Sequence, residues 1–394
     1  MRQLRVVTTA IVVVGAFALM VPVDSALAVS GGSLTIARGS ATPRAYASPK
    51  ASPTTTTTDA TSPATTTSVP APGDLITAGP SRRECLDPNF SDTGLAAIKT
   101  AVAKFDSVTN STVTCLSAYL NAAPNWGSWE HPWITSAQYG YTDWVKANPL
   151  TRQLVLEVDL IPTPLADVED PLSWEESCAQ GDFNSYATVL GESLVAAGLE
   201  HSVLRIGAEM NGIWEEDYVG PTMQEQHLWA KCFANEATAL RAAPGERFLI
   251  DWNPNACVGD IPFANYYPGN TYVDIVGLDI YDVSCLTPKL RQTFQQLTAT
   301  RLGITSFEAF AAARDKPMSF PEWGLKKYPN GDDPSYINGM GAIFDRRNMA
   351  FETYFNVNLK IRPYLALGTQ APRALAAFKK WFGNGLLESR FAQR

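Results

Sequence analysis

The feature that most constrains the fold is an alternation of short apolar segments, rich in β-branched residues, with longer segments of helical periodicity. Eight apolar segments are candidate strands, at residues 75–78, 113–120, 153–160, 202–208, 248–252, 273–280, 316–320 and 363–367. Helical periodicity occupies residues 92–105, 135–147, 182–197, 222–240, 286–297 with 307–314, 334–355 and 371–382. Eight strands alternating with helices predict an α/β fold, a single (β/α)8 TIM barrel. An open doubly wound sheet is the alternative, but no Gly-rich phosphate loop follows the first strand.

The part of the chain before the predicted barrel has a different composition. Residues 1–28 have the layout of a secretory signal peptide, with two early arginines, an apolar run and Ala26-Leu27-Ala28 as a cleavage site. An uncleaved membrane anchor is the alternative, but the apolar run is short for a bilayer. Residues 29–73 are dominated by Ala, Ser, Thr and Pro, which predicts a disordered linker. We therefore expect a secreted, extracellular protein whose folded domain spans residues 74–394.

Six cysteines fit the expected export. The chain has no C-x-x-C pair, which argues against a zinc ribbon or a redox dithiol, and an even count in an exported chain predicts disulfides. Six cysteines allow fifteen pairings. Our hypothesis joins neighbours in the sequence, which gives the pairs Cys85–Cys115, Cys178–Cys232 and Cys257–Cys285.

Charge and histidine content remove several classes of function. The net charge is −8, the pI is about 5.1 and there is no run of five or more basic residues, which argues against a nucleic-acid partner. Three widely spaced histidines, His131, His201 and His227, argue against a metal-dependent hydrolase. The sequence has no G-x-S-x-G elbow followed by a histidine, which argues against serine hydrolase chemistry. Carboxylate chemistry remains open, and no segment after the signal region predicts insertion into a membrane.

Alternate positions within the predicted strands place charged side chains on one face and apolar side chains on the other. The charged faces carry Glu157 and Asp159 in the third strand, Arg205 and Glu209 in the fourth, and Asp279 with Tyr281 in the sixth. Both faces of a barrel strand are buried, so we expect these side chains to converge inside the barrel near its C-terminal end, where barrel enzymes carry their sites. Buried charges are costly unless they are paired or used. An internal salt-bridge network that holds the barrel together is the structural alternative.

Two glutamates end strands on different sides of the predicted barrel. Glu209 ends the fourth strand and Glu322 follows the seventh, so they are expected to face each other across the barrel mouth. Glycosidic hydrolysis needs such a pair of carboxyl groups, about 5 Å apart for retention of configuration and farther apart for inversion. Tryptophans near the strand ends are candidates for stacking on sugar rings, with ordinary core packing as the alternative for each: Trp126, Trp129, Trp214, Trp252 and Trp323.

The segment Arg205-Ile-Gly-Ala-Glu209-Met-Asn211-Gly-Ile-Trp214, with Pro321-Glu322-Trp323-Gly324 after the seventh strand, resembles glycoside hydrolase family 26. That family belongs to the clan of retaining barrel glycosidases with catalytic glutamates on strands four and seven. Its best-known members are endo-β-1,4-mannanases, and others act on mixed-linkage β-glucan or β-xylan. The family usually has a histidine before its acid/base, where this chain has Ala208, so mannan is a default substrate here.

The resemblance implies roles for individual residues. Glu209 would be the acid/base and Glu322 the nucleophile, and Tyr281 would hydrogen-bond the nucleophile. The remaining candidates for substrate binding are Arg205, Asn211, Trp214, Trp323, Trp126 and Asp279. Such a mechanism requires no metal and no organic cofactor.

We therefore expect a secreted retaining endo-glycosidase that hydrolyses β-linked polysaccharide and acts as a monomer. Three alternatives stay open. A non-catalytic polysaccharide-binding barrel would keep the fold, an endo-glucanase or xylanase would differ in the sugar, and a transglycosylase would differ only in the acceptor that reaches the intermediate.

Overall fold

The computed structural model describes residues 75–77, 83–88, 94–120, 123–163, 171–256, 258–283, 292–327, 330–346, 348–357 and 364–383. The expected signal peptide, the expected linker and the Cys257–Cys285 pair lie outside these residues. Among the helices described, none is both long and apolar enough to cross a membrane.

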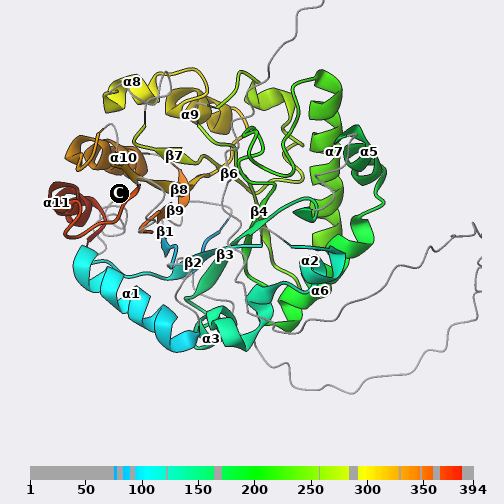
Figure 1. The fold of residues 1–394 in the computed structure, drawn as a ribbon, viewed down its shortest axis with the longest axis horizontal. Coiled ribbons are helices and arrows are strands. Elements are labelled where there is room, and N and C mark those ends of the chain that lie inside the picture. Colours follow the sequence, from blue (N-terminus) through cyan, green and yellow to red (C-terminus); the bar gives the residue numbers. More distant parts are fainter. Residues whose placement is uncertain are drawn as a thin grey trace, which may run out of the picture. The chain divides into compact units, whose positions relative to one another are not determined.

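The described residues form the predicted barrel, with the strands at the centre and the helices as a ring around them (Figure 1). Its parallel strands are β1 Arg83–Leu86, β2 Cys115–Tyr119, β3 Gln153–Val158, β4 Val203–Ile206, β5 Leu249–Trp252, β6 Ile275–Gly277 continued by β7 Ile280–Tyr281, β8 Met318–Lys326 and β9 Met349–Tyr354. Each pairs with the next in the ring, and β9 closes the barrel because it pairs with both β8 and β1. A short strand, β10 Tyr364–Leu365, adds to β8 in the antiparallel direction.

Helices and single 3-10 turns connect the strands. They are α1 Leu95–Thr109, α2 Trp126–Glu130, η1 Trp133–Thr135, η2 Ala137–Tyr139, α3 Tyr141–Lys146, α5 Pro171–Gln180, α6 Asn184–Ala196, α7 Met223–Leu240, η3 Phe263–Asn265, α8 Phe294–Thr298, α9 Ile304–Ala312, α10 Pro334–Arg346 and α11 Pro372–Trp381. The longest of them, α7, begins with a capping box in which Thr222 and Glu225 satisfy each other's backbone N–H groups.

The first and last strands of the barrel differ from the prediction. The segment 75–78 was expected to be the first strand, but β1 lies at Arg83–Leu86, and Ile76 instead packs inside the barrel. The last barrel strand was expected at 363–367, but it is β9, within the segment 334–355 that was predicted to be helical. All six residues of β9 are buried, so the strand lacks the alternation that would have separated it from the end of α10.

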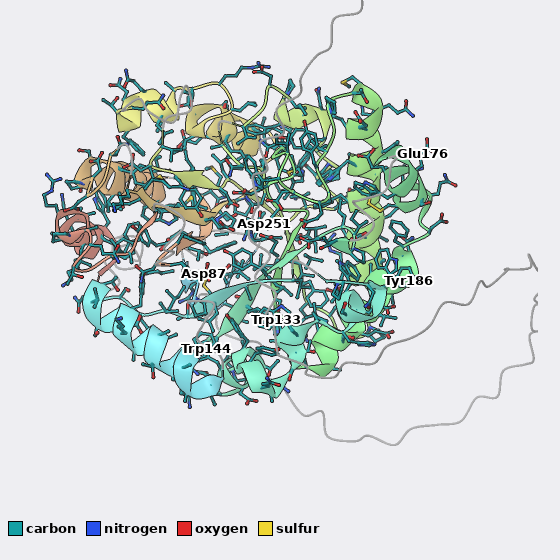
Figure 2. All side chains as sticks on the ribbon, in the orientation of Figure 1. Asp87, Trp133, Trp144, Glu176, Tyr186 and Asp251 are labelled. Carbon is teal, nitrogen blue, oxygen red and sulfur yellow. A yellow bond between two sulfur atoms is a disulfide. The ribbon has the colours of Figure 1, made fainter. Side chains whose placement is uncertain are left out.

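The predicted division between the two faces of the strands is confirmed. Leu204 and Ile206 belong to the large apolar core, whereas Val203 belongs to a small apolar cluster formed by residues from the N-terminal halves of the strands. Arg205, between them, is completely buried and hydrogen-bonds to side chains from other strands. Figure 2 shows Asp251 among the strands, and it accepts a hydrogen bond from Ser319 of β8. The barrel interior is therefore apolar at one end and charged at the other.

Two of the predicted disulfides are confirmed. Cys85–Cys115 joins β1 to β2, and Cys178–Cys232 joins α5 to α7 in the outer layer.

Replacing Cys178 and Cys232 together by Ala is expected to lower the free energy of unfolding by about 2–4 kcal/mol. The bond spans 54 residues, so its loss frees a long loop in the unfolded chain. Urea unfolding of the purified protein measures the change. Ser185→Ala, at an exposed position of α6, is the control and should shift stability by less than about 0.5 kcal/mol. An unchanged urea midpoint in the double variant would contradict the prediction.

Candidate active site

A tight turn after β4 presents Glu209 at the barrel mouth. Gly207 has φ +53°, and a Cβ there would come within 2.7 Å of the Trp229 ring, so only glycine fits. Glu209 itself has φ +52°, a left-handed conformation that costs roughly 1 kcal/mol or more in a residue with a side chain. Its backbone N–H donates to the carbonyl of Asn253 at 2.7 Å. The strained turn is therefore held by the loop after the neighbouring strand, β5.

Both carboxyl oxygens of Glu209 accept hydrogen bonds. The Trp214 indole N–H donates to Oε2 at 2.8 Å, and the amide Nδ2 of Asn255 donates to Oε1. Burial raises the pKa of Glu209 to about 7, and the charge of Glu322 adds to this rise, whereas the two hydrogen bonds act in the opposite direction. Glu209 is therefore able to hold or release a proton near neutral pH.

Glu322 has a different environment. Its Oε1 accepts from Nη1 of Arg205 at 3.1 Å, and its Oε2 accepts from the Tyr281 hydroxyl at 2.8 Å. Its backbone N–H donates to Oδ1 of Asp279 at 2.8 Å. Because a cation and two further polar groups fix Glu322, its carboxylate is oriented before any substrate arrives.

Arg205 connects the residues below Glu322. Its Nη2 lies 2.7 Å from Oδ2 of Asp279, its Nε donates to Oδ1 of Asn253 at 2.7 Å, and its Nη1 lies 3.4 Å from Oε2 of Glu157. Burial alone would lower the pKa of Arg205, but the surrounding carboxylates outweigh burial and raise it well above its ordinary value. The salt-bridge network considered as the structural alternative therefore exists, and it includes Glu322 of the candidate site.

The two glutamates are close together. Glu209, Asp279 and Glu322 each place one carboxylate oxygen within 4.8 Å of the others. This distance matches the spacing of about 5 Å found in retaining glycosidases and is shorter than the gap of about 6.5 Å or more that inverting enzymes need for a water molecule.

Two groups among the described residues have the spacing of a metal site, and neither fits an ion. Both oxygens of Glu322 and both of Asp279 already accept hydrogen bonds, and the Arg205 cation contacts both residues. The other group combines Cys178, Cys232 and Glu236, but its two sulfurs form a disulfide and offer no thiolate.

More carboxyl groups flank Glu209 on the side of β3. Glu157 and Asp159 lie at the end of β3, and Glu215 and Asp217 lie in the loop that follows Glu209. Burial raises the pKa of each, for Glu157 to about 8 and for Asp217 to about 7, and the charges of neighbouring carboxylates add to the rise, which for Asp217 is the charge of Glu216. These carboxyl groups therefore keep their protons to higher pH than ordinary carboxyl groups do.

Only one of the five tryptophans considered for sugar stacking lies beside the glutamates with part of its ring exposed, namely Trp214. Trp323 is completely buried, and its indole donates to Glu352 on β9. Trp126 stacks on Tyr186 of α6 at 4.1 Å, and Figure 2 shows Tyr186 in the outer helical layer. Trp129 and Trp252 belong to the core. Four of these five tryptophans therefore pack in or against the hydrophobic core, and only Trp214 remains a candidate for stacking on a sugar ring.

Asn211 is buried and faces the neighbouring loop. Its side chain bonds to the backbone N–H and C=O of Asn255 and to the C=O of Val258. Its contacts are therefore made with the protein backbone beside Glu209.

Sequence reasoning missed several polar residues at the mouth. The Tyr119 hydroxyl, at the end of β2, donates to Oδ2 of Asp87 at 3.0 Å, and burial followed by the charge of Glu322 raises the pKa of Asp87. Trp133 donates its indole N–H to the carbonyl of Tyr119 and is 37% exposed. Asp87 follows β1, whose position was predicted wrongly, while Trp133 lies in a short 3-10 turn without helical or strand periodicity.

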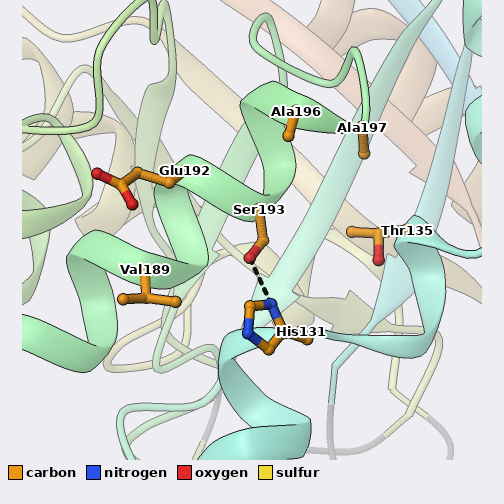
Figure 3. Close-up of a pocket in the computed structure, with 7 residues that line it drawn as sticks. All are labelled: His131, Thr135, Val189, Glu192, Ser193, Ala196 and Ala197. Atoms are coloured by element: carbon orange, nitrogen blue, oxygen red, sulfur yellow. Dashed lines mark hydrogen bonds between the residues drawn. The ribbon is translucent and has the colours of Figure 1, made fainter.

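A separate surface depression of about 510 Å³ lies between α2, η1 and α6 (Figure 3). Nδ1 of His131 lies 2.8 Å from the hydroxyl of Ser193, which is the pairing that a serine nucleophile would require. Ser193 lies within α6, whose backbone N–H groups are committed to the helix, so no oxyanion hole forms there. This pair therefore gives no support to serine hydrolase chemistry.

Comparisons with known proteins agree with this geometry. Residues 202–318 match the model of glycosyl hydrolase family 26, a segment that contains β4 with Glu209 and ends at the first residue of β8. A GH26 β-mannanase from Bacteroides ovatus is similar in structure, with 16% identity, a TM-score of 0.54 and coverage of 76% of this chain and 88% of that one. An endo-β-1,4-mannanase double mutant from Cellulomonas fimi has 18% identity, a TM-score of 0.53 and coverage of 79% and 72%. No curated relative matches the chain.

At these identities the solved structures show a shared fold. The match to glycosyl hydrolase family 26 covers residues 202–318, which include β4 and Glu209 but not Glu322. Over this segment the chain resembles glycosyl hydrolase family 26.

Proposed function

We propose that this chain is a secreted retaining endo-glycosidase that cleaves β-linked polysaccharide, with β-1,4-mannan as the first substrate to test. One observation carries the proposal: a carboxylate oxygen of Glu209 lies within 4.8 Å of one of Glu322, and the two carboxyl groups have unlike environments. Glu209 has a pKa of about 7 and Glu322 is held by Arg205 and Tyr281. Two carboxyl groups with different environments are what a division into acid and nucleophile requires.

The mechanism follows from these environments. Glu322 attacks the anomeric carbon and forms a glycosyl–enzyme ester, while protonated Glu209 donates its proton to the leaving oxygen. Glu209, now ionised, then removes a proton from a water molecule that attacks the ester, and Glu322 is released. Arg205 and Tyr281 orient Glu322 throughout.

Mannan is the first substrate to test because two structurally similar proteins are a β-mannanase and an endo-β-1,4-mannanase. Ala208, next to the acid/base, is buried and offers no polar group to a substrate. Sugar preference is therefore tested on a panel. The paired glutamates favour catalysis over a role in binding alone, because binding needs no second carboxyl group at this distance.

Secretion is supported by the disulfides Cys85–Cys115 and Cys178–Cys232, which form in oxidising compartments. Residues 1–28 as a signal peptide and 29–73 as a linker complete this proposal.

The test is release of reducing sugar from mannan, mixed-linkage β-glucan and β-xylan, with the first product's anomeric configuration followed by NMR. We expect cleavage within the chains of at least one polymer, mannan first, and a β-configured first product. Absence of cleavage on all three would overturn the proposed activity. An α-configured first product would overturn retention.

A further inference from the structure

Asn255 contacts the candidate acid/base directly. It lies in the loop after β5, and its Nδ2 donates to Oε1 of Glu209, while Trp214 donates to Oε2. The two donors differ in what they can do next. An indole N–H only donates, whereas a carboxamide that turns about its last bond offers an oxygen that accepts.

The backbone of Asn255 is fixed from two sides. On the side of β4, Oδ1 of Asn211 accepts from the N–H of Asn255 at 2.8 Å, and Nδ2 of Asn211 donates to its C=O at 2.8 Å. On the side of β6, the N–H of Asp279 donates to the carbonyl of Pro254 at 3.0 Å, and the N–H of Ala256 donates to the carbonyl of Asp279 at 2.8 Å. The backbone therefore has little freedom, and adjustment is left to the side-chain amide.

This arrangement matches the two states that Glu209 must adopt. The ionised carboxylate has no proton and accepts from both Trp214 and Asn255. Once protonated, it has a hydroxyl that needs an acceptor or a substrate oxygen, and Trp214 cannot supply one. A turned Asn255 amide supplies Oδ1, so the same residue fits both protonation states of Oε1.

We propose that Asn255 is a positioning residue for Glu209, and that Asn211 acts through Asn255 by holding its backbone. The proposal rests on the proposed function of Glu209 as acid/base. Asn211 then supports the acid/base indirectly, which agrees with its burial and with its hydrogen bonds to the backbone of Asn255.

Other charged groups also face Glu209, and they remain in every variant of Asn255. They come from the strands and loops packed around it and are Glu157, Arg205, Glu215, Asp279 and Glu322. A change in the pKa of Glu209 in a variant of Asn255 is therefore due to the lost amide, because these charged groups are the same in wild type and variant.

Asn255→Ala removes a hydrogen bond that favours the ionised form of Glu209, so its pKa should rise. We expect the alkaline limb of kcat/KM, where the acid loses its proton, to move up by about one pH unit. kcat should fall about 10- to 100-fold, with KM changed by less than about twofold, because the amide is assigned to Glu209 and to no sugar. Asn211→Ala should move the limb in the same direction by a smaller amount.

The double variant Asn211→Ala/Asn255→Ala should lose no more activity than Asn255→Ala alone, because Asn211 acts through Asn255. Asn265→Ala is the matched control, since this amide bonds to Gln226 of α7 away from the glutamates, and it should keep the wild-type limb and kcat. An unmoved limb in Asn255→Ala, or additive losses in the double variant, would overturn the proposal.

A second measurement does not depend on activity. The protein labelled with 13C at glutamate carboxyl carbons is titrated by NMR, with the Glu209 signal assigned by its absence in Glu209→Gln. The pKa of Glu209 should be higher in Asn255→Ala than in wild type, and an equal pKa would overturn the inference. If wild type cleaves no polysaccharide, the proposed function fails while this titration still decides the role of Asn255.

Discussion

Replacing Glu322 by Ala is expected to lower kcat on the cleaved polysaccharide by at least about three orders of magnitude, which is about 4 kcal/mol of barrier. In the proposed mechanism Glu322 is the nucleophile, and Arg205 and Tyr281 hold its carboxylate by hydrogen bonds. Glu209→Ala should cause a loss of similar size on a natural polysaccharide, whose leaving oxygen needs a proton. Initial rates of reducing-sugar release measure both effects.

Substrates with an activated aryl leaving group separate the two roles. Such a group departs without a proton, so Glu209→Ala should form the glycosyl–enzyme readily and then accumulate it. Azide, which attacks without a general base, should restore turnover and give a glycosyl azide of retained configuration. In Glu322→Ala, azide can attack only in place of the missing nucleophile, so the product should have inverted configuration. If Glu209→Ala gave the inverted azide and Glu322→Ala the retained one, Glu322 would be the acid/base and Glu209 the nucleophile.

The pH dependence follows from the pKa of Glu209, which burial raises to about 7. The donor must be protonated, so kcat/KM should fall as pH rises through about 7. With the activated substrate, Glu209→Ala should lose this alkaline limb in the first step. Glu192→Ala, an exposed glutamate of α6 outside the barrel mouth, is the control and should keep both activity and limb. If the fall of kcat/KM at alkaline pH persists in Glu209→Ala, another group and not Glu209 is the one that titrates.

The sequence-based prediction succeeded where strand parity was clear. Alternate positions of β4 separate Arg205 from Leu204 and Ile206, and the structure keeps that separation. The same rule would have excluded two tryptophans. Trp323 follows Glu322 in β8, and Trp252 follows the inward-facing Asp251 at the end of β5, so both side chains point outward into the core.

The positions of loop residues were not predictable in this way. Asn255 reaches Glu209 only because Asn211 and Asp279 hold the loop after β5 in place, which are contacts between segments more than 20 residues apart. Hydrophobic periodicity carries no information about such contacts. The strand β9 was missed for another reason. It is buried on both faces, so its sequence shows no alternation of apolar and polar residues.

Arg205→Met is expected to destabilise the protein by about 3–5 kcal/mol at pH 8. The side chain is completely buried, and methionine of similar length would leave Glu157, Asp279 and Glu322 without their cation. Wild-type Arg205 acts to lower the pKa of Glu157 and of Asp279, although burial keeps both raised. Its removal should therefore raise these two pKa values further above those of the unfolded chain.

The sign of the pH effect follows from that rise. A carboxyl group whose folded-state pKa lies above its unfolded-state pKa stabilises the fold at low pH, and this contribution is lost as pH rises through the folded-state pKa. Because Glu157 and Asp279 are already raised in wild type, the additional loss of stability in Arg205→Met should be smallest near pH 5 and should grow as pH rises through about 8, the pKa of Glu157 in wild type. Urea unfolding of wild type and variant at both pH values measures it.

A surface arginine provides the matched control. Arg301 pairs with Asp260 at 2.7 Å, but its side chain is 62% exposed, so Arg301→Met should change stability by less than about 0.5 kcal/mol at either pH. Arg205→Lys should recover part of the stability, because it keeps the charge but not the fork that reaches Asn253, Asp279 and Glu322 together. Equal stability of Arg205→Met and wild type at pH 8 would show that the carboxylates do not depend on this cation. The salt-bridge network would then serve only to orient Glu322, and Arg205→Met should still lose activity.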